Sequence, residues 1–128
     1  MQTTVSPGSA LFVTLILLLP GTAALAAGNA PAGAMIFEEL CAECHSTTGK
    51  NKKGPSLRGI VGRMAGRAQG FADYSDGMKN SGLVWTAEQL DRYLTKPDQF
   101  IPRVKMTFKG LSDARERAEL IEFLSTRK

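Results

Sequence analysis

The sequence predicts an all-α fold of three to five helices joined by long loops. Apolar residues recur at helical spacing near residues 34–40, 90–94 and 112–126. No stretch of useful length alternates apolar and polar residues as a strand does. The 128 residues, 43% of them hydrophobic, have the size of one small domain. We therefore expect a small helical domain in which the first and last of these helices pack together.

The chain begins with the features of a secretory signal. Residues 10–19, ALFVTLILLL, form an apolar run that Pro20 interrupts, and the sequence ending at Ala26 fits an A-x-A cleavage site. The alternative is an uncleaved membrane anchor, but a membrane span needs about 20 apolar residues. We predict that residues 1–26 are a cleaved signal peptide and that residues 27–128 form a single domain.

The first predicted helix begins at Ala34 and ends at a cysteine. Before it, residues 28–33 are rich in Gly, Pro and Ala, and we expect them to form a leader with little to hold it. Gly33 is small enough to let another helix approach closely, or it is simply a helix-start residue. The apolar stripe of this helix consists of Met35, Ile36, Phe37 and Leu40.

A C-x-x-C-H motif follows, formed by Cys41, Cys44 and His45, which are the only cysteines and the only histidine of the chain. This motif is the attachment pattern of a c-type haem. On a helical turn, side chains three positions apart face the same way, so both sulfurs can reach the two vinyl groups of one porphyrin. We predict one covalent haem c per chain, with His45 directed at the iron.

Three other uses of these residues are alternatives. A disulfide between Cys41 and Cys44 would close a very short, strained loop. A thiol–disulfide catalyst is expected near a βαβ pattern, which the sequence lacks. A structural zinc site needs four ligands, so it would require a carboxylate such as Glu43. Haem attachment is favoured because His45 directly follows the second cysteine.

The loop after the motif contains Gly54-Pro55. Proline lacks an N–H and offers only its carbonyl, so Pro55 is a candidate acceptor for the Nδ1–H of His45, which leaves Nε2 for iron. A plain turn is the equal alternative.

Hydrogen-bond donors for the haem propionates are expected further along the chain. Residues 62–71 are Gly-rich and basic but lack the spacing of a phosphate loop. The two propionates are anionic, and burying them requires paired charge or hydrogen bonds. The candidate donors are Arg63, Tyr74 and Trp85. Trp85 is the only Trp, and core packing is its alternative role.

A second helix is predicted after Thr86. The sequence Thr86-Ala87-Glu88-Gln89 matches a capping box, and Pro97 ends the helix. Its apolar face consists of Leu90, Tyr93 and Leu94.

Residues 100–106 are predicted to form a loop rather than a helix or strand. A thioether on a loop opposite His45 is what a second axial ligand would look like, so Met106 is the candidate. Met64 and Met78 are competing candidates.

Residues 112–126 are predicted to form the last helix. Phe37 and Leu40 of the first helix would pack against Leu120 and Phe123 and so join the two ends of the domain. Its acidic residues are expected to face water: Asp113, Glu116, Glu119 and Glu122.

From about Gly33 to the C-terminus, the chain resembles a class I cytochrome c of the mitochondrial type, especially the soluble bacterial relatives. The matching segments are CAECH, GPSLRGIVGR, GF…YSD, Trp85, LDRYL with Pro97, and IP…KM. The resemblance implies that His45 and Met106 are the axial ligands and that Tyr93 lies near Met106. It also implies that Pro55 bonds His45 and that the propionate side is served by Arg63, Tyr74 and Trp85.

The chain departs from the family pattern at four places. Arg103-Val104 stands where Gly-Thr is usual before Lys-Met, and Asp73 is one extra residue before Tyr74. Met78 stands where mitochondrial members carry Asn. Mitochondrial members are not made with a cleaved secretory signal, so the signal indicates a bacterial periplasm.

These features predict a soluble, monomeric one-electron carrier rather than an enzyme. Its partners would be redox proteins with acidic surfaces, met through a set of basic residues, with no nucleic acid and no stable membrane insertion. The alternatives are a five-coordinate or weakly ligated haem protein, for gas binding or peroxidase-like chemistry, and a membrane-anchored redox module. The basic residues are Lys50, Lys52, Lys53, Lys96, Arg103, Lys105 and Lys109.

Overall fold

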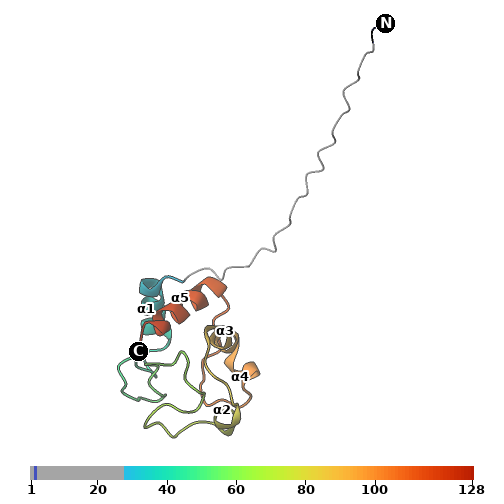
Figure 1. Cartoon of the computed structure of the whole chain (residues 1–128). Coiled ribbons are helices and arrows are strands. Elements are labelled where there is room, and N and C mark those ends of the chain that lie inside the picture. Colours follow the sequence, from blue (N-terminus) through green and yellow to red (C-terminus); the bar gives the residue numbers. More distant parts are fainter. Residues whose placement is uncertain (1, 3–27) are drawn as a thin grey trace.

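The protein is all-α, as predicted. The computed structural model describes residue 2 and residues 28–128, so the predicted signal and its cleavage site lie outside the described residues. Five helices form in the described part, joined by long loops (Figure 1). The only strand-like pairing there is one antiparallel bridge between Met64 and Val84. Helices α1 and α5 lie together at one end of the domain and α2 lies at the other (Figure 1).

Helix α1 spans Ala30–Leu40 and begins earlier than the sequence predicted. Asn29 is its N-cap, and its side-chain oxygen accepts a hydrogen bond from the backbone N–H of Ala32 at 3.4 Å. Pro31 occupies the first turn, where its missing N–H costs nothing. The expectation of a leader with little to hold it was therefore wrong.

Helix α5, Ala114–Ser125, packs directly on α1. Phe37 is buried, with its ring centroid 5.5 Å from that of Phe123. A Cβ on Gly33 would overlap the backbone carbonyl of Glu119, and it would come within 2.8 Å of the Phe123 Cβ. Gly28 is pressed against the α5 backbone in the same way. The terminal helices pack as predicted, and glycine allows their close approach.

Two predictions for these helices were wrong in detail. Met35 is 75% exposed and Leu40 is 42% exposed, so the apolar stripe of α1 is narrower than expected. Glu119 was expected to face water but is buried, and its Oε1 accepts a hydrogen bond from Arg115 Nε at 3.1 Å. Glu119 is covered because Gly33 brings α1 over this part of α5.

Helix α3 spans Ala87–Thr95 and is capped by Thr86. The Thr86 Oγ1 accepts a hydrogen bond from the backbone N–H of Gln89 at 3.1 Å. In a capping box the Gln89 side chain would accept a hydrogen bond from the backbone N–H of Thr86. Here that N–H donates instead to the carbonyl of Val84 at 2.8 Å. Pro97 ends α3 as predicted and also begins the short helix α4, Pro97–Phe100.

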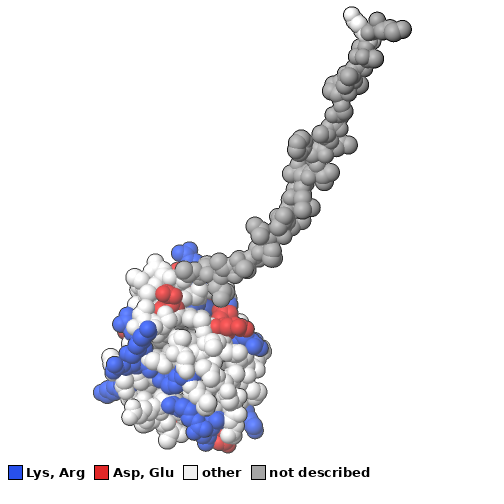
Figure 2. All heavy atoms as spheres, viewed as in Figure 1, with Lys and Arg blue, Asp and Glu red and all other residues white. Residues whose placement is uncertain are grey.

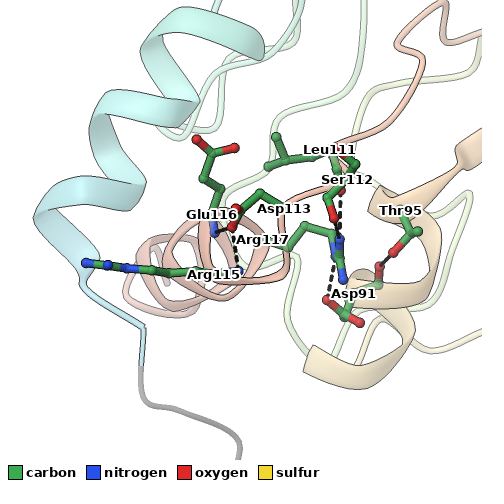
Figure 3. Close-up of polar contacts among 8 residues, drawn as sticks. All are labelled: Asp91, Thr95, Leu111, Ser112, Asp113, Arg115, Glu116 and Arg117. Atoms are coloured by element: carbon green, nitrogen blue, oxygen red, sulfur yellow. Dashed lines mark hydrogen bonds and ion pairs between the residues drawn. The ribbon is translucent and has the colours of Figure 1, made fainter.

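A buried arginine connects α3 to α5 (Figure 3). The Nε of Arg117 donates to Asp91 on α3 at 2.7 Å. Its Nη1 donates to the carbonyls of Leu111 and Ser112 at 2.8 and 2.9 Å. These hydrogen bonds compensate for the burial of the Arg117 charge, and they fix the loop before α5 relative to α3.

Helix α2 spans Asp76–Asn80 and was not predicted. Ser75 caps it by accepting the Met78 N–H at 3.1 Å. No helix in the described part of the chain is long and apolar enough to cross a membrane.

Candidate functional site

The C-x-x-C-H motif forms a hydrogen-bonded turn directly after α1, which ends at Leu40. The N–H of Cys41 donates to the carbonyl of Phe37 at 2.8 Å, and the N–H of His45 donates to the carbonyl of Cys41 at 2.9 Å. Both thiols are free and half-buried. The motif therefore has the helical geometry that brings side chains three positions apart to one side.

His45 is oriented by the loop that follows the motif. Its Nδ1 lies 2.8 Å from the carbonyl oxygen of Pro55. A carbonyl can only accept, so Nδ1 carries the proton and Nε2 keeps its lone pair. Burial lowers the pKa of His45, with smaller contributions from Lys52 and Arg63, although the bond to Pro55 opposes the shift. The imidazole is therefore neutral at pH 7, as a metal ligand must be.

Gly54 packs against the face of this imidazole, a role that the sequence did not reveal. A Cβ at Gly54 would lie 2.5 Å from His45 Cε1 and 2.9 Å from Nδ1. Only glycine lets the backbone come this close to the ring. The Gly-Pro pair was the available signal in the sequence, but it predicted a contact with His45 only for Pro55.

The thiol of Cys41 has the protonation state of an unreactive cysteine. Burial, together with the nearby Cys44, raises the pKa of Cys41 to about 11. A thiol–disulfide catalyst needs a lowered thiol pKa, so this environment disfavours that alternative. The zinc alternative is also disfavoured, because no cluster of three or more His, Cys, Asp or Glu side chains suited to a metal occurs among the described residues.

Two of the predicted docking lysines contact the motif itself. Lys52 Nζ donates to the carbonyl of Ala42. Lys53 Nζ lies 2.6 Å from the carboxylate of Glu43, and both side chains are exposed. The pKa of Glu43 is lowered by the hydrogen bond from Lys53 and by its charge. An exposed ion pair stabilises a fold very little, but it offsets part of the positive charge beside the cysteines.

The predicted propionate donors have different surroundings. The Nη1 and Nη2 of Arg63 donate to the carbonyls of Arg58 and Ser56, each at 3.0 Å. The hydroxyl of Tyr74 accepts the N–H of Ala68 at 3.1 Å, which leaves the Tyr74 proton free to donate.

Trp85 is buried and connects two of the predicted site residues. Its backbone N–H donates to the carbonyl of Arg63 at 2.9 Å, next to the bridge between residues 64 and 84. Its ring centroid lies 4.9 Å from that of Tyr93, which in turn lies 6.2 Å from that of Phe100. Burial raises the pKa of Tyr93 to about 12, so its hydroxyl keeps its proton at neutral pH.

Met106 lies on the loop between α4 and α5. It is half-buried and packs at the margin of the hydrophobic core, together with its neighbour Val104. Arg103 has a positive φ of 61°, a conformation that strongly favours glycine. Met78 is also half-buried, on α2, whereas Met64 is 48% exposed.

The residues present fit a covalently held haem. Two free thiols lie one turn apart, and the next side chain is a neutral imidazole whose Nε2 keeps its lone pair. Apolar side chains that a flat apolar ring could cover lie only partly buried around the core. They include Leu57, Met78, Leu83, Val104, Met106 and Phe108.

The family model and the similar proteins all point to one family. The model of the family described as Cytochrome c matches residues 30–128. The chain is 46% identical over 98 residues to cytochrome c type-1 of Ascaris suum, covering 76% of this chain and 87% of the relative. It is 40% identical over 102 residues to cytochrome c of Gibberella zeae, covering 78% of this chain and 95% of the relative.

A bacterial relative is similar at the same level. The chain is 44% identical over 99 residues to the cytochrome c-type cyt cy of Rhodobacter capsulatus, covering 77% of this chain and 49% of that longer protein. Together with the match over residues 30–128, these identities show that the chain belongs to the cytochrome c family, whose members carry a covalently bound c-type haem.

Proposed function

We propose that this chain is a periplasmic one-electron carrier in which His45 and Met106 are the axial ligands of the haem iron. The observation that carries the proposal is the 2.8 Å contact between His45 Nδ1 and Pro55 O, which leaves Nε2 for a metal directly beside two free thiols. When bound, the haem supplies a one-electron Fe(II)/Fe(III) couple. With both axial positions filled by the protein, the iron is not open to a substrate, which favours a carrier over an enzyme.

The other residues of the site hold and shield the group. Cys41 and Cys44 attach it, and Pro55 fixes the ring of His45. Trp85 and Tyr93 form the buried aromatic wall, and their packing excludes water. The free proton of the Tyr74 hydroxyl supports its role toward a propionate. Arg63 contributes positive charge to the same side and orders the loop through two carbonyls.

Ligation by Met106 is tested by spectroscopy of the holoprotein. We expect the ferric form to show the weak red charge-transfer band of thioether ligation, and Met106→Ala to abolish it. Met64→Ala is the matched control, because Met64 is 48% exposed. Met78→Ala tests the half-buried competitor. Loss of the band in either control, and not in Met106→Ala, would reassign the ligand.

The competing function is a haem protein with an open or weakly held sixth position. The positive φ of Arg103, three residues before Met106, is the observation that favours it. Carbon monoxide distinguishes the two functions. A carrier with both axial ligands in place should bind it slowly and weakly when reduced, whereas prompt and tight binding at neutral pH would contradict ligation by Met106.

Docking to acidic partner surfaces follows from the charge. The chain has a formal net charge of +4, and Figure 2 shows more Lys and Arg than Asp and Glu side chains on the visible face. Such a surface speeds encounter with acidic partners and makes the rate fall as salt rises. The rate of reduction by an acidic partner protein, measured across ionic strengths, tests this proposal. A rate independent of salt would remove it.

The location is tested by N-terminal sequencing of the exported protein. We expect cleavage after Ala26, which would leave residues 27–128 as a single periplasmic domain that acts as a monomer. A protein that keeps the apolar run 10–19 would instead be a membrane-anchored redox module.

A further inference from the structure

The segment that carries Met106 is held at two points by the chain around α2. Lys105, adjacent to Met106, forms an ion pair with the carboxylate of Asp73. At the other end of the segment, a Cβ on Gly77 would lie 2.9 Å from the carbonyl oxygen of Pro102. The segment from 102 to 105 is thus packed closely at its start and paired by charge at its end.

Between these two points the backbone is strained. Arg103 has a φ of 61°, in the left-handed region that residues with a Cβ rarely adopt. A strained residue keeps such a conformation only when its surroundings hold it there. Contacts on both sides of Arg103 therefore have a positional role, and the contact nearer to Met106 is the ion pair of Lys105.

The charges on the two sides are complementary. Asp73 and Asp76 lie on the α2 side, and Arg103 and Lys105 lie on the Met106 side. The pKa of Asp76 is lowered first by its hydrogen bond and ion pair with Lys79, and further by the nearby charges of Arg103 and Lys105. Because Asp76 is already paired with Lys79, Asp73 is the carboxylate with which Lys105 forms its ion pair.

We propose that Asp73 is a positioning residue for Met106: through Lys105, it holds the 102–105 segment so that the thioether stays at the iron. This inference rests on the axial ligation proposed above. It gives a role to Asp73, the one extra residue that this chain has before Tyr74. Lys105 is then engaged within the molecule rather than free for a partner surface.

The expected effect is small and measurable. The Lys105 and Asp73 side chains are 56% and 75% exposed, so the pair belongs among surface ion pairs, which contribute weakly. Loss of the pair should make the Met106–iron bond about two- to fivefold easier to displace. High salt should reduce this difference, because exposed charges are screened.

The experiment titrates imidazole into the ferric holoprotein and follows the thioether charge-transfer band. We expect Asp73→Asn and Lys105→Gln each to bind imidazole about two- to fivefold more tightly than wild type, with the double variant no tighter than either single variant. Glu122→Gln, on the exposed face of α5, makes the same change in net charge as Asp73→Asn and should match wild type.

The outcomes separate this inference from the ligation on which it rests. A wild-type protein without the band would overturn ligation by Met106 and the role of Asp73 with it. A wild-type protein with the band, and an Asp73→Asn variant with unchanged imidazole affinity, would overturn only the positioning role. Strictly additive effects of Asp73→Asn and Lys105→Gln would do the same, because they would show that the two side chains act independently.

Discussion

Arg103 is the residue whose chemistry fits its backbone least well. The sequence identified it as a departure from the family pattern, because a small flexible residue is usual there. The structure shows the local consequence of that departure: the arginine has a backbone φ of 61°, in the left-handed region. The loop has the shape that a glycine would adopt without strain, and the arginine is accommodated in it.

We expect Arg103→Gly to stabilise the holoprotein by up to about 1.5 kcal/mol. Relief of the left-handed strain contributes about 1–2 kcal/mol, and the greater flexibility of glycine in the unfolded chain offsets about 0.5–1 kcal/mol of it. Chemical unfolding measures the difference. Arg103→Ala is the matched control, because alanine keeps the strain while removing the charge. An Arg103→Gly variant that is less stable than Arg103→Ala by about 0.5–1 kcal/mol, the entropy cost of glycine alone, would show that the backbone conformation carries no penalty.

At the scale of the helices, the periodic pattern predicted the long elements and missed the short ones. Helices α1, α3 and α5 were expected, with ends displaced by a few residues. Helices α2 and α4 have five and four residues, too few for an apolar stripe to appear in the sequence. The early start of α1 depends on Asn29 and on contact with α5, and neither contributes to helical periodicity.

We expect Gly33→Ala to destabilise the protein by about 1–3 kcal/mol, the usual cost of overpacking. The added methyl group would collide with the Glu119 carbonyl and force α1 away from α5. Met35→Ala on the same helix is the control, because Met35 is 75% exposed and should have little effect. Thermal unfolding of both variants tests this. A Gly33→Ala protein as stable as wild type would show that the helices can separate without loss.

The N-terminus of α5 should make stability depend on pH. Asp113 accepts the backbone N–H groups of Glu116 and Arg115 at 3.0 and 2.8 Å (Figure 3), and these bonds lower the pKa of Asp113. A lowered folded-state pKa gives stability that is present above the unfolded value of about 3.9 and lost as the pH falls through the folded value.

We therefore expect wild type to be more stable than Asp113→Asn at pH 7, with the difference closing as the pH falls below about 3.9. Asparagine is a good N-cap, so the variant keeps the cap and loses only the charge. Denaturant unfolding at pH 7 and at acid pH measures both proteins. A difference that stays constant with pH would contradict a contribution from the ionised carboxylate.

At the scale of the whole molecule, the domain is small and leaves apolar side chains at the margin of its core only partly covered. A small domain buries a smaller share of its surface on folding than a large one does. Several apolar side chains at the margin of the core stay partly exposed, among them Leu57, Leu83 and Met106. A bound haem would cover apolar surface that the side chains leave in water.

We expect the chain without haem to be poorly folded. The Cys41→Ser/Cys44→Ser variant, which cannot form thioethers, should lose most of its helical circular dichroism and its cooperative unfolding when made without haem. The holoprotein is the reference, and it should unfold in one cooperative step. A haem-free chain that unfolds cooperatively would show that the side chains alone form a sufficient core.

The sequence by itself determined the fold class and the cofactor, and it predicted where the cofactor is attached. It could do so because three chemistry-bearing residues lie within one helical turn, and because long amphipathic helices leave a periodic pattern. It also indicated Pro55, because a proline can offer only an acceptor.

Only the tertiary structure decided what depends on close approach between distant segments. Glu119 is covered, and Gly54 lies against the imidazole of His45. The ion pair of Asp73 with Lys105 joins residues far apart in the chain. No local pattern encodes such contacts, because each depends on how two backbones pack in space rather than on the spacing of residues along one of them.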